Sequence, residues 1–204
     1  MVILPSSDPQ AISRAIEHLT AGHVVAYPTE TFYGLGARHD DRNAIRRIYA
    51  LKQRPEDKAL PVIIGSYPQL AMLTDMTDHR ADILTSHFWP GPLTIIVPAR
   101  RGLTEGIVNN QKIAVRLPGP SFALDLVSAA GYPITSTSAN LSGLPPAASV
   151  RMVTGYFGDT IDFVIDGGES RATLPSTIVD LTSDVAAIVR EGIIPAASIL
   201  ALLR

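Results

Sequence analysis

The chain has 204 residues, of which 46% are hydrophobic and 18% are charged, so it can bury a core and is not expected to be disordered. A net charge of −2 argues against a globally basic nucleic-acid-binding protein, although a local basic patch would be compatible with it. Because the chain has no cysteine, disulfides, thiolate metal sites and cysteine nucleophiles are excluded.

The first ten residues, MVILPSSDPQ, lack the basic flank and the long apolar core of a signal peptide. No apolar run approaches the ~18 residues that span a bilayer. We therefore expect a cytoplasmic protein with no membrane contact. The length suits one domain over residues 1–204.

Helical and extended patterns alternate along the chain. In chain order, they predict a helix at 8–22, a strand at 23–28, a helix at 41–54, a strand at 59–65, helices at 67–73 and 78–89, strands at 91–99 and 112–119, a helix at 120–131, a strand that breaks into polar residues at 132–140, a helix at 149–158, strands at 161–168, 176–182 and 186–192, and a helix at 195–204. The strands at 176–182 and 186–192 are close enough to form a hairpin around Ser183-Asp184. This alternation indicates an α/β fold with a mixed sheet and flanking helices.

The stretch YPTETFYGLG, residues 27–36, follows the first buried strand. Its glycines are compatible with a turn that needs positive φ, or with a close approach of backbone. Thr29, Glu30 and Thr31 make it more polar than a plain turn requires, although no role for Glu30 follows from the sequence. The segment GLGARH has a histidine where a dinucleotide-binding pattern needs its third glycine, so a Rossmann interpretation is weak.

Cationic side chains occur in two unusual settings. Lys52 and Arg54 lie at the end of a predicted helix, with Lys58 just beyond, where they would either complement the helix dipole or clamp phosphates. Arg116 and Arg190 each lie in an otherwise apolar strand, where a cation is costly unless it is paired. For Arg116 the sequence leaves two partners open, a structural carboxylate or an anionic ligand. Two such arginines on separate strands favour an anion pocket over coincidence.

The stretch ITSTSANLSG places five hydroxyl or amide side chains within a few residues after a strand (Thr135, Ser136, Thr137, Ser138 and Asn140). A helix cap would use only one or two of them. There is no G-x-S-x-G elbow and no nearby histidine, so a covalent nucleophile is a poor interpretation. A hydrogen-bonding cradle for phosphate or a small polar ligand fits better.

Seven segments in fixed order closely resemble the YrdC/TsaC family of L-threonylcarbamoyladenylate synthases: YPTETFYGLG, LKQRPEDKALPV, FWPGPLTIIVP, IAVRLPG, ITSTSANLSG, PSTIVDL and IVREG. The resemblance runs from about residue 24 to residue 192. It implies a twisted mixed sheet with flanking helices around a large concave pocket. It also implies the short, single-domain form of the family.

The resemblance implies synthesis of L-threonylcarbamoyl-AMP from L-threonine, bicarbonate and ATP, with Mg²⁺ accompanying ATP and with release of pyrophosphate. That product feeds the N6-threonylcarbamoyladenosine (t6A) modification of tRNA, through a separate transfer machinery. No metal ligand from the protein is expected, because the histidines have no metal spacing.

The resemblance also assigns site residues by position. Catalytic roles would fall to Lys52, Arg54, Ser138 and Asn140, as the K-x-R and S-x-N pairs. ATP would be bound by Arg54, Lys58, Ser138, Asn140 and Arg190. The threonine substrate would be bound by Thr31, Arg116, Ser136 and Ser176. Some relatives have a histidine near Ile63, so the contacts of the threonine pocket there are left open.

Two alternatives remain. A module that binds double-stranded RNA or tRNA, or a ribosome-maturation factor, could use the same basic pocket, and its binding would have a steep salt dependence. A carbamoyl-transferring protein of the hydrogenase-maturation type would carry cysteine-rich zinc modules, which a chain without cysteine does not have.

Overall fold

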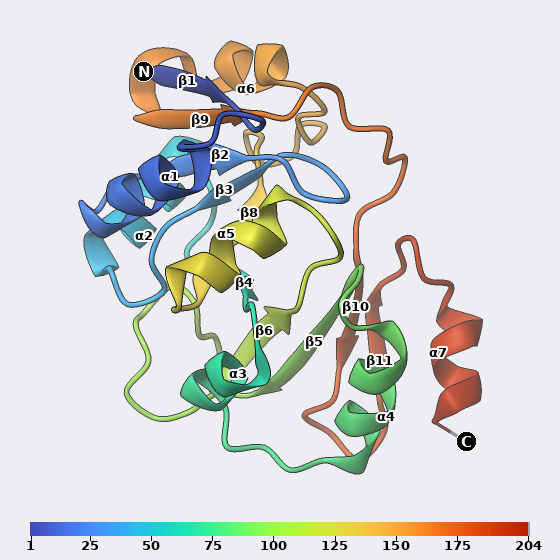
Figure 1. The fold of residues 1–204 in the computed structure, drawn as a ribbon. Helices are drawn as coiled ribbons and strands as arrows, with labels where there is room; N and C mark the ends of the chain where they lie inside the picture. The colour runs from blue at the N-terminus through green and yellow to red at the C-terminus, as the bar shows by residue number, and fades with distance from the viewer. Residues whose placement is uncertain (204) are drawn as a thin grey trace.

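Short strands and helices alternate in the computed structural model, which describes residues 1–203 (Figure 1). The strands are β1 (Val2–Pro5), β2 (Val25–Tyr27), β3 (Gly34–Gly36), β4 (Val62–Ile63), β5 (Leu93–Pro98), β6 (Lys112–Arg116), β7 (Ile134–Thr135), β8 (Thr137–Ser138), β9 (Phe163–Asp166), β10 (Thr177–Asp180) and β11 (Ala187–Arg190). The helices are α1 (Ala11–Thr20), α2 (Arg42–Lys52), α3 (Tyr67–Leu73), α4 (His79–Phe88), α5 (Phe122–Ala130), α6 (Val150–Phe157) and α7 (Ala196–Leu202), with one 3₁₀ turn at Gly158–Thr160.

The strands form two mixed sheets rather than the one sheet that the sequence indicated. Sheet A has the order β1-β9-β2-β3-β8, and sheet B the order β11-β10-β5-β6-β4-β7. Figure 1 shows sheet A in the upper half of the view and sheet B in the lower half. Parallel and antiparallel pairs occur in both sheets, so the mixed α/β class is confirmed.

Residues 134–138 pass directly from one sheet to the other. In sheet B, β7 pairs antiparallel with β4, and one residue later β8 pairs antiparallel with β3 in sheet A. The backbone N–H of Ser136, between the two strands, donates to the carbonyl of Pro61 at 2.8 Å. The hydroxyl-rich stretch therefore lies where the two sheets meet.

The predicted hairpin of β10 and β11 is confirmed, with antiparallel pairing of Ile178 to Arg190 and of Val179 to Ile188. The helix ends agree less well with the sequence. The first helix was expected to begin at residue 8, but α1 begins at Ala11, after the N-cap Gln10, whose N–H donates to the Asp8 carboxylate at 2.7 Å. The last residue of the predicted C-terminal helix, residue 204, lies outside the described residues.

Two strands were not predicted. β1 pairs with β9, more than 150 residues away along the chain, and most of its side chains are exposed, so its own sequence carries no amphipathic signal. β3 consists of Gly34, Leu35 and Gly36, and neither glycine has positive φ, so a left-handed turn is the wrong interpretation. The structure instead confirms the close approach: a Cβ on Gly36 would lie 2.7 Å from the Tyr27 ring and 2.8 Å from the Thr135 carbonyl.

Two hydrophobic clusters hold the elements together. The smaller one joins α1 and α5 to sheet A through residues such as Leu19, Leu126 and Phe163. The larger one extends through sheet B and contains Trp89, which is buried and donates its indole N–H to the Leu93 carbonyl at 2.8 Å. None of the helices in residues 1–203 combines the length and the apolar character that a bilayer crossing requires.

Candidate functional site

A cavity of about 420 Å³ lies between the two sheets. Its lining takes residues from β3 and β8 of sheet A and from β4, β5, β6, β10 and β11 of sheet B. Seven of the ten site residues predicted from the sequence line it: Thr31, Arg54, Arg116, Ser136, Ser138, Ser176 and Arg190. Side chains separated by up to 159 positions in sequence, Thr31 and Arg190, therefore meet at one place.

Arg54 reaches the cavity from the segment that follows α2. Gln53, the C-cap that follows α2, has the left-handed conformation with φ of 49°, and this reversal sets the direction in which the chain continues to Arg54. The guanidinium donates to the carbonyls of Lys58 at 2.8 Å and Ala59 at 3.0 Å. Burial lowers the pKa of Arg54, so this cation is held at a cost that an anionic ligand would relieve.

Arg190, at the end of β11, is fixed through Ser176. Its guanidinium donates to the Ser176 carbonyl at 2.8 Å and to the Ser176 hydroxyl at 3.0 Å. That hydroxyl lies 3.1 Å from the hydroxyl of Thr94. Burial lowers the pKa of Arg190, and so does the positive charge of Arg116, which means that the two cations lie close enough to repel each other.

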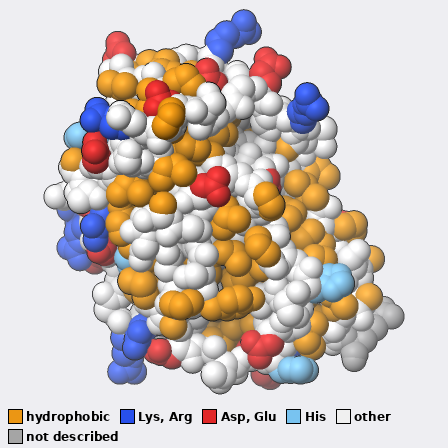
Figure 2. Space-filling model, viewed as in Figure 1, with side chains coloured by type: hydrophobic (Ala, Val, Ile, Leu, Met, Phe, Trp, Pro, Cys, Tyr) orange, Lys and Arg blue, Asp and Glu red, His pale blue; other side chains and the backbone are white. Residues whose placement is uncertain are grey.

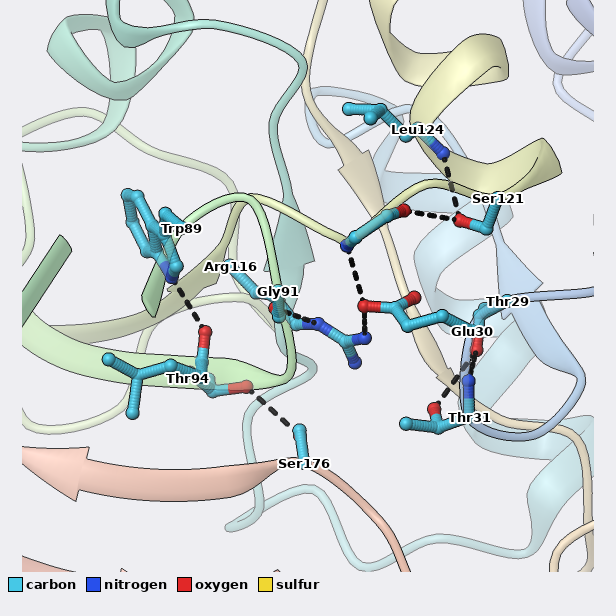
Figure 3. Close-up of polar contacts among 12 residues, drawn as sticks. Thr29, Glu30, Thr31, Trp89, Gly91, Thr94, Arg116, Ser121, Leu124 and Ser176 are labelled. Carbon is cyan, nitrogen blue, oxygen red and sulfur yellow. Dashed lines mark hydrogen bonds and ion pairs between the residues drawn. The ribbon is translucent and has the colours of Figure 1, made fainter. Parts of the chain in front are cut away.

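Arg116, at the end of β6, is paired (Figure 3). Its guanidinium donates to the Gly91 carbonyl at 3.1 Å and forms an ion pair with the carboxylate of Glu30. The same Glu30 oxygen accepts the backbone N–H of Gly119 at 2.7 Å. Of the two settings that the sequence left open for Arg116, a structural carboxylate and a ligand cavity, the structure has both.

Thr31 belongs to a turn that the side chain of Thr29 stabilises. The Thr29 hydroxyl donates to the Phe32 carbonyl at 2.7 Å and accepts the Thr31 N–H at 3.0 Å. The hydroxyls of Thr29 and Thr31 lie 3.0 Å apart, and both residues line the cavity. Gly34 also lines it, and a Cβ there would approach the Ser136 hydroxyl to 3.3 Å. The small residues therefore leave room beside these hydroxyls.

The remaining three predicted residues, Lys52, Lys58 and Asn140, are not in the lining of the cavity. Lys52 is buried, and its ammonium donates to the carbonyl of Ser138, to the carbonyl of Asn140 at 2.8 Å and to the side-chain oxygen of Asn140 at 3.1 Å. Burial and the charge of Arg54 lower the pKa of Lys52 to about 7. Lys58 is exposed. A direct contact of Lys52 or Lys58 with ATP stays a prediction.

Asn140 organises the loop that follows β8. Its amide N–H groups donate to the carbonyls of Leu141 at 2.9 Å and Leu144 at 2.6 Å. Its side-chain oxygen accepts the Ser138 hydroxyl at 2.6 Å, in addition to Lys52. The K-x-R and S-x-N segments are therefore joined: Lys52 and Asn140 hold the loop, while Arg54 and Ser138 face the cavity.

Among the polar residues at the site, Thr94 was missed and Glu30 was left without a role. Thr94 lines the cavity, but threonine is common in strands, so LTIIV gives no signal for it. Glu30 had no role because its partners, Arg116 and Gly119, are 86 and 89 residues away in the chain. A buried arginine in a strand signals that a carboxylate is needed somewhere, but it does not say which one.

The charged side chains in the described lining of the cavity are all cations. Arg54, Arg116 and Arg190 line it, and its described lining contains no aspartate or glutamate. Within residues 1–203, no group of three or more His, Asp or Glu side chains is placed to hold a metal ion. Cations together with hydroxyls suit an anionic ligand that carries several oxygens.

The family profile of the Sua5, YciO and YrdC proteins, described as "Telomere recombination", matches residues 17–192. The chain belongs to the Sua5/YciO/YrdC family. A threonylcarbamoyl-AMP synthase of Pyrococcus abyssi is 41% identical over 178 residues, which are 85% of this chain and 52% of the relative. A threonylcarbamoyl-AMP synthase of Klebsiella pneumoniae is 37% identical over 181 residues, which are 87% of this chain and 93% of the relative.

A solved structure of a Sua5/YciO/YrdC member agrees closely with the fold. The crystal structure of P. abyssi Sua5 complexed with L-threonine superposes with a TM-score of 0.93 at 35% identity, and it covers 100% of this chain and 61% of the other. The chain thus spans about half the length of the P. abyssi enzyme and nearly all of the K. pneumoniae one.

Proposed function

We propose that the protein is a nucleotidyltransferase that makes L-threonylcarbamoyl-AMP from L-threonine, bicarbonate and ATP, with release of pyrophosphate. One observation carries the proposal: three arginines and several hydroxyls from both sheets line one cavity that has no carboxylate in its described lining. The names of the P. abyssi and K. pneumoniae relatives support it, and so does the L-threonine bound to P. abyssi Sua5.

The reaction needs such a field because its reactants repel one another. A carboxylate, a carbamate and a triphosphate must come together in one cavity. A unit charge pair at ~4 Å is worth ~4 kcal/mol of gross attraction at an effective dielectric near 20, so each arginine can offset one such repulsion. Burial lowers the pKa values of Arg54 and Arg190, which fits cations that an anionic ligand would stabilise.

The chemistry requires no nucleophilic side chain. The threonine amine and bicarbonate give a carbamate and water. A carbamate oxygen then attacks the α-phosphorus of ATP, the bond to the β-phosphate oxygen breaks, and pyrophosphate leaves. Phosphoryl-type transfer depends mainly on positioning and on charge stabilisation, which arginines and hydroxyls supply.

The proposed roles divide the residues of the cavity lining between ATP and threonine. Arg54, Ser138 and Arg190 would hold ATP, and Thr31, Arg116, Ser136 and Ser176 would hold threonine. Lys52 and Asn140 would act by holding the loop that carries Ser138, since both are hydrogen-bonded to that loop. Lys58, exposed at the edge of the Arg54 segment, would contact phosphates only as a mobile charge.

Mg²⁺ would arrive with ATP. Mg²⁺ prefers carboxylates, phosphate oxygens and water, and the described lining of the cavity offers it hydroxyls but no carboxylate. The triphosphate itself would therefore hold the ion, which would neutralise part of the charge on the leaving pyrophosphate.

The reaction would be the first step of t6A formation. A separate machinery in the cytoplasm would then transfer the threonylcarbamoyl group from the product to tRNA. The product is a mixed anhydride, which water would hydrolyse. A protein that makes it is therefore expected to release it to a transfer partner rather than to store it.

An assay with ATP, Mg²⁺ and labelled bicarbonate tests the proposal. With L-threonine, we expect release of pyrophosphate and a labelled adenylate. With glycine, which lacks the hydroxyethyl group, we expect at most a few per cent of that rate. No labelled adenylate with any of the three amino acids threonine, serine and glycine would contradict the proposal.

The alternative of an RNA-binding module predicts binding that needs neither ATP nor threonine. On the face in Figure 2, the Lys and Arg side chains lie near the margins, and no continuous basic surface crosses the middle. A steep loss of RNA affinity with salt, in a protein that forms no adenylate, would favour the alternative.

A further inference from the structure

Glu30 stands out because it lies between two cavity residues without lining the cavity. Thr29 and Thr31 on either side of it line the space of about 420 Å³, whereas Glu30 borders an adjoining recess of about 550 Å³. The Thr29 hydroxyl locks the turn through Thr31 and Phe32, so the direction of the Glu30 side chain is fixed.

One carboxylate oxygen of Glu30 does all the bonding. Oε1 accepts from Arg116 and from the N–H of Gly119, as the dashed lines in Figure 3 show. Oε2 is buried and has no hydrogen-bond partner among residues 1–203. A half-satisfied buried carboxylate is an inefficient way to stabilise a fold, so a role other than stability is the better explanation for it.

The contacts hold Arg116 along one edge only. Its Nε donates to Gly91 at 3.1 Å and its Nη2 to Glu30, while its Nη1 makes no hydrogen bond to any described residue. Arg116 lines the cavity, so the unoccupied edge remains for a ligand. Three segments meet in this arrangement: the turn at 28–33, the segment at Gly91 and the loop at Gly119.

Gly119 completes the support. A Cβ on Gly119 would lie 3.4 Å from the Glu30 Cγ and 3.5 Å from the Gly91 Cα, so a side chain at this position would contact both other segments. Ser121, which caps α5, donates its hydroxyl to the Gly119 carbonyl at 2.8 Å and fixes the loop from the other side. The Glu30 carboxylate therefore accepts a backbone N–H from a loop that the Ser121 hydroxyl also holds in place.

We propose that Glu30 is a positioning residue for amino-acid binding: its carboxylate aims Arg116, whose free edge binds the carboxylate of the amino-acid substrate. The inference rests on the proposed function for the identity of that substrate. It assigns Glu30 a role through Arg116 alone, so ATP binding, which the proposal assigns to Arg54 and Arg190, should not depend on it.

The test measures L-threonine and ATP binding separately by calorimetry. Glu30→Ala should weaken L-threonine binding tenfold or more and leave the ATP affinity within about twofold. Glu30→Gln should keep threonine affinity within about threefold, because its amide oxygen can still accept from Gly119 and Arg116. Equal losses for both ligands, unchanged threonine binding in Glu30→Ala, or no rescue in Glu30→Gln would each overturn the inference.

Asp180→Ala is the matched control. Asp180, on β10, forms an ion pair at 2.9 Å with Lys112, which lies on β6 as Arg116 does, and Asp180 does not line the cavity. It should reduce stability without changing threonine affinity. A selective loss of threonine affinity in this control would overturn the inference, since breaking any ion pair on β6 would then suffice.

A second measurement does not depend on the substrate. The Nη2 protons of Arg116, which donate to Glu30, should exchange slowly with solvent in the wild type and in Glu30→Gln, and quickly in Glu30→Ala, when they are followed by NMR and assigned with Arg116→Lys. If the wild type bound no threonine, the proposed function would be contradicted. The exchange measurement would still test whether Glu30 fixes the orientation of Arg116. Equal exchange in all three proteins would overturn the inference.

Discussion

Arg54, Arg116 and Arg190 show how single residues are prepared for an anion. Each guanidinium is held along part of its edge by protein oxygens, and each lines the same cavity. Fixing a cation before the ligand arrives removes the cost of ordering it later. Arg116 is nonetheless paired with Glu30, and its positive charge still contributes to lowering the pKa of Arg190.

Arg54→Ala should lower adenylate formation by about 100-fold or more, on the scale of losing one preorganised electrostatic stabiliser. Pyrophosphate release under saturating substrates is the measurement. Arg46→Ala is the control, since Arg46 is exposed on α2, the helix that precedes the Arg54 segment, and lies outside the cavity lining. A near-wild-type rate in Arg54→Ala would refute the role.

At the scale of elements, β3 shows why its glycines are needed. The strand is wedged between β2 and β8, and the ring of Tyr27 and the side chain of Ile134 occupy the space where a Gly36 side chain would stand. The strand thus brings the polar turn at 28–33 and Ser138 of β8 to the same cavity.

Gly36→Ala should destabilise the protein by about 1–3 kcal/mol, the usual cost of overpacking. Gly155→Ala, in α6 where a Cβ would meet nothing within 4 Å, should instead stabilise by about 0.5–1 kcal/mol. Urea unfolding measures both changes. A neutral Gly36→Ala would show that the neighbouring side chains can move aside, and that the close approach does not constrain the strand.

Lys52 links α2 to the loop after β8, and its titration should be visible in stability. Its pKa is about 7 in the folded protein, against an ordinary value of 10.5. Between these values the unfolded chain binds more protons than the folded one, so stability rises with pH. The unfolding free energy of the wild type, relative to Lys52→Met, should therefore increase by about 2 kcal/mol from pH 7 to pH 9.

Chemical unfolding of both proteins at several pH values in that range measures this difference. The comparison with Lys52→Met cancels the other titrating groups, because methionine does not titrate. A difference that stayed constant between pH 7 and pH 9 would show that Lys52 keeps an ordinary pKa despite its burial.

On the scale of the whole molecule, the cavity is a joint between two sheets. Its lining takes strands from both, and residues 134–138 run from one sheet to the other. A ligand that fills the cavity would therefore contact both sheets at once and couple their unfolding.

Saturating ligand should raise the melting temperature. A ligand at 100 times its dissociation constant adds about 2.7 kcal/mol, which corresponds to about 5–10 °C for a chain of this size. ATP with Mg²⁺ and L-threonine should each produce a shift in thermal denaturation, and added salt should reduce it, because the contacts are charged. Sodium chloride at matched ionic strength is the control, and two separate unfolding transitions would contradict the coupling.

The sequence by itself determined the alternation of strands and helices, the β10–β11 hairpin and seven of the residues that line the cavity. Hydrophobic period and turn residues are local signals, and polar groups at strand ends are visible without coordinates. The tertiary structure decided the division into two sheets, the strand β3 and the partner of Arg116. These depend on which distant backbone meets which: Gly36 against Tyr27 and Thr135, and Glu30 against Gly119, are contacts for which no local pattern exists.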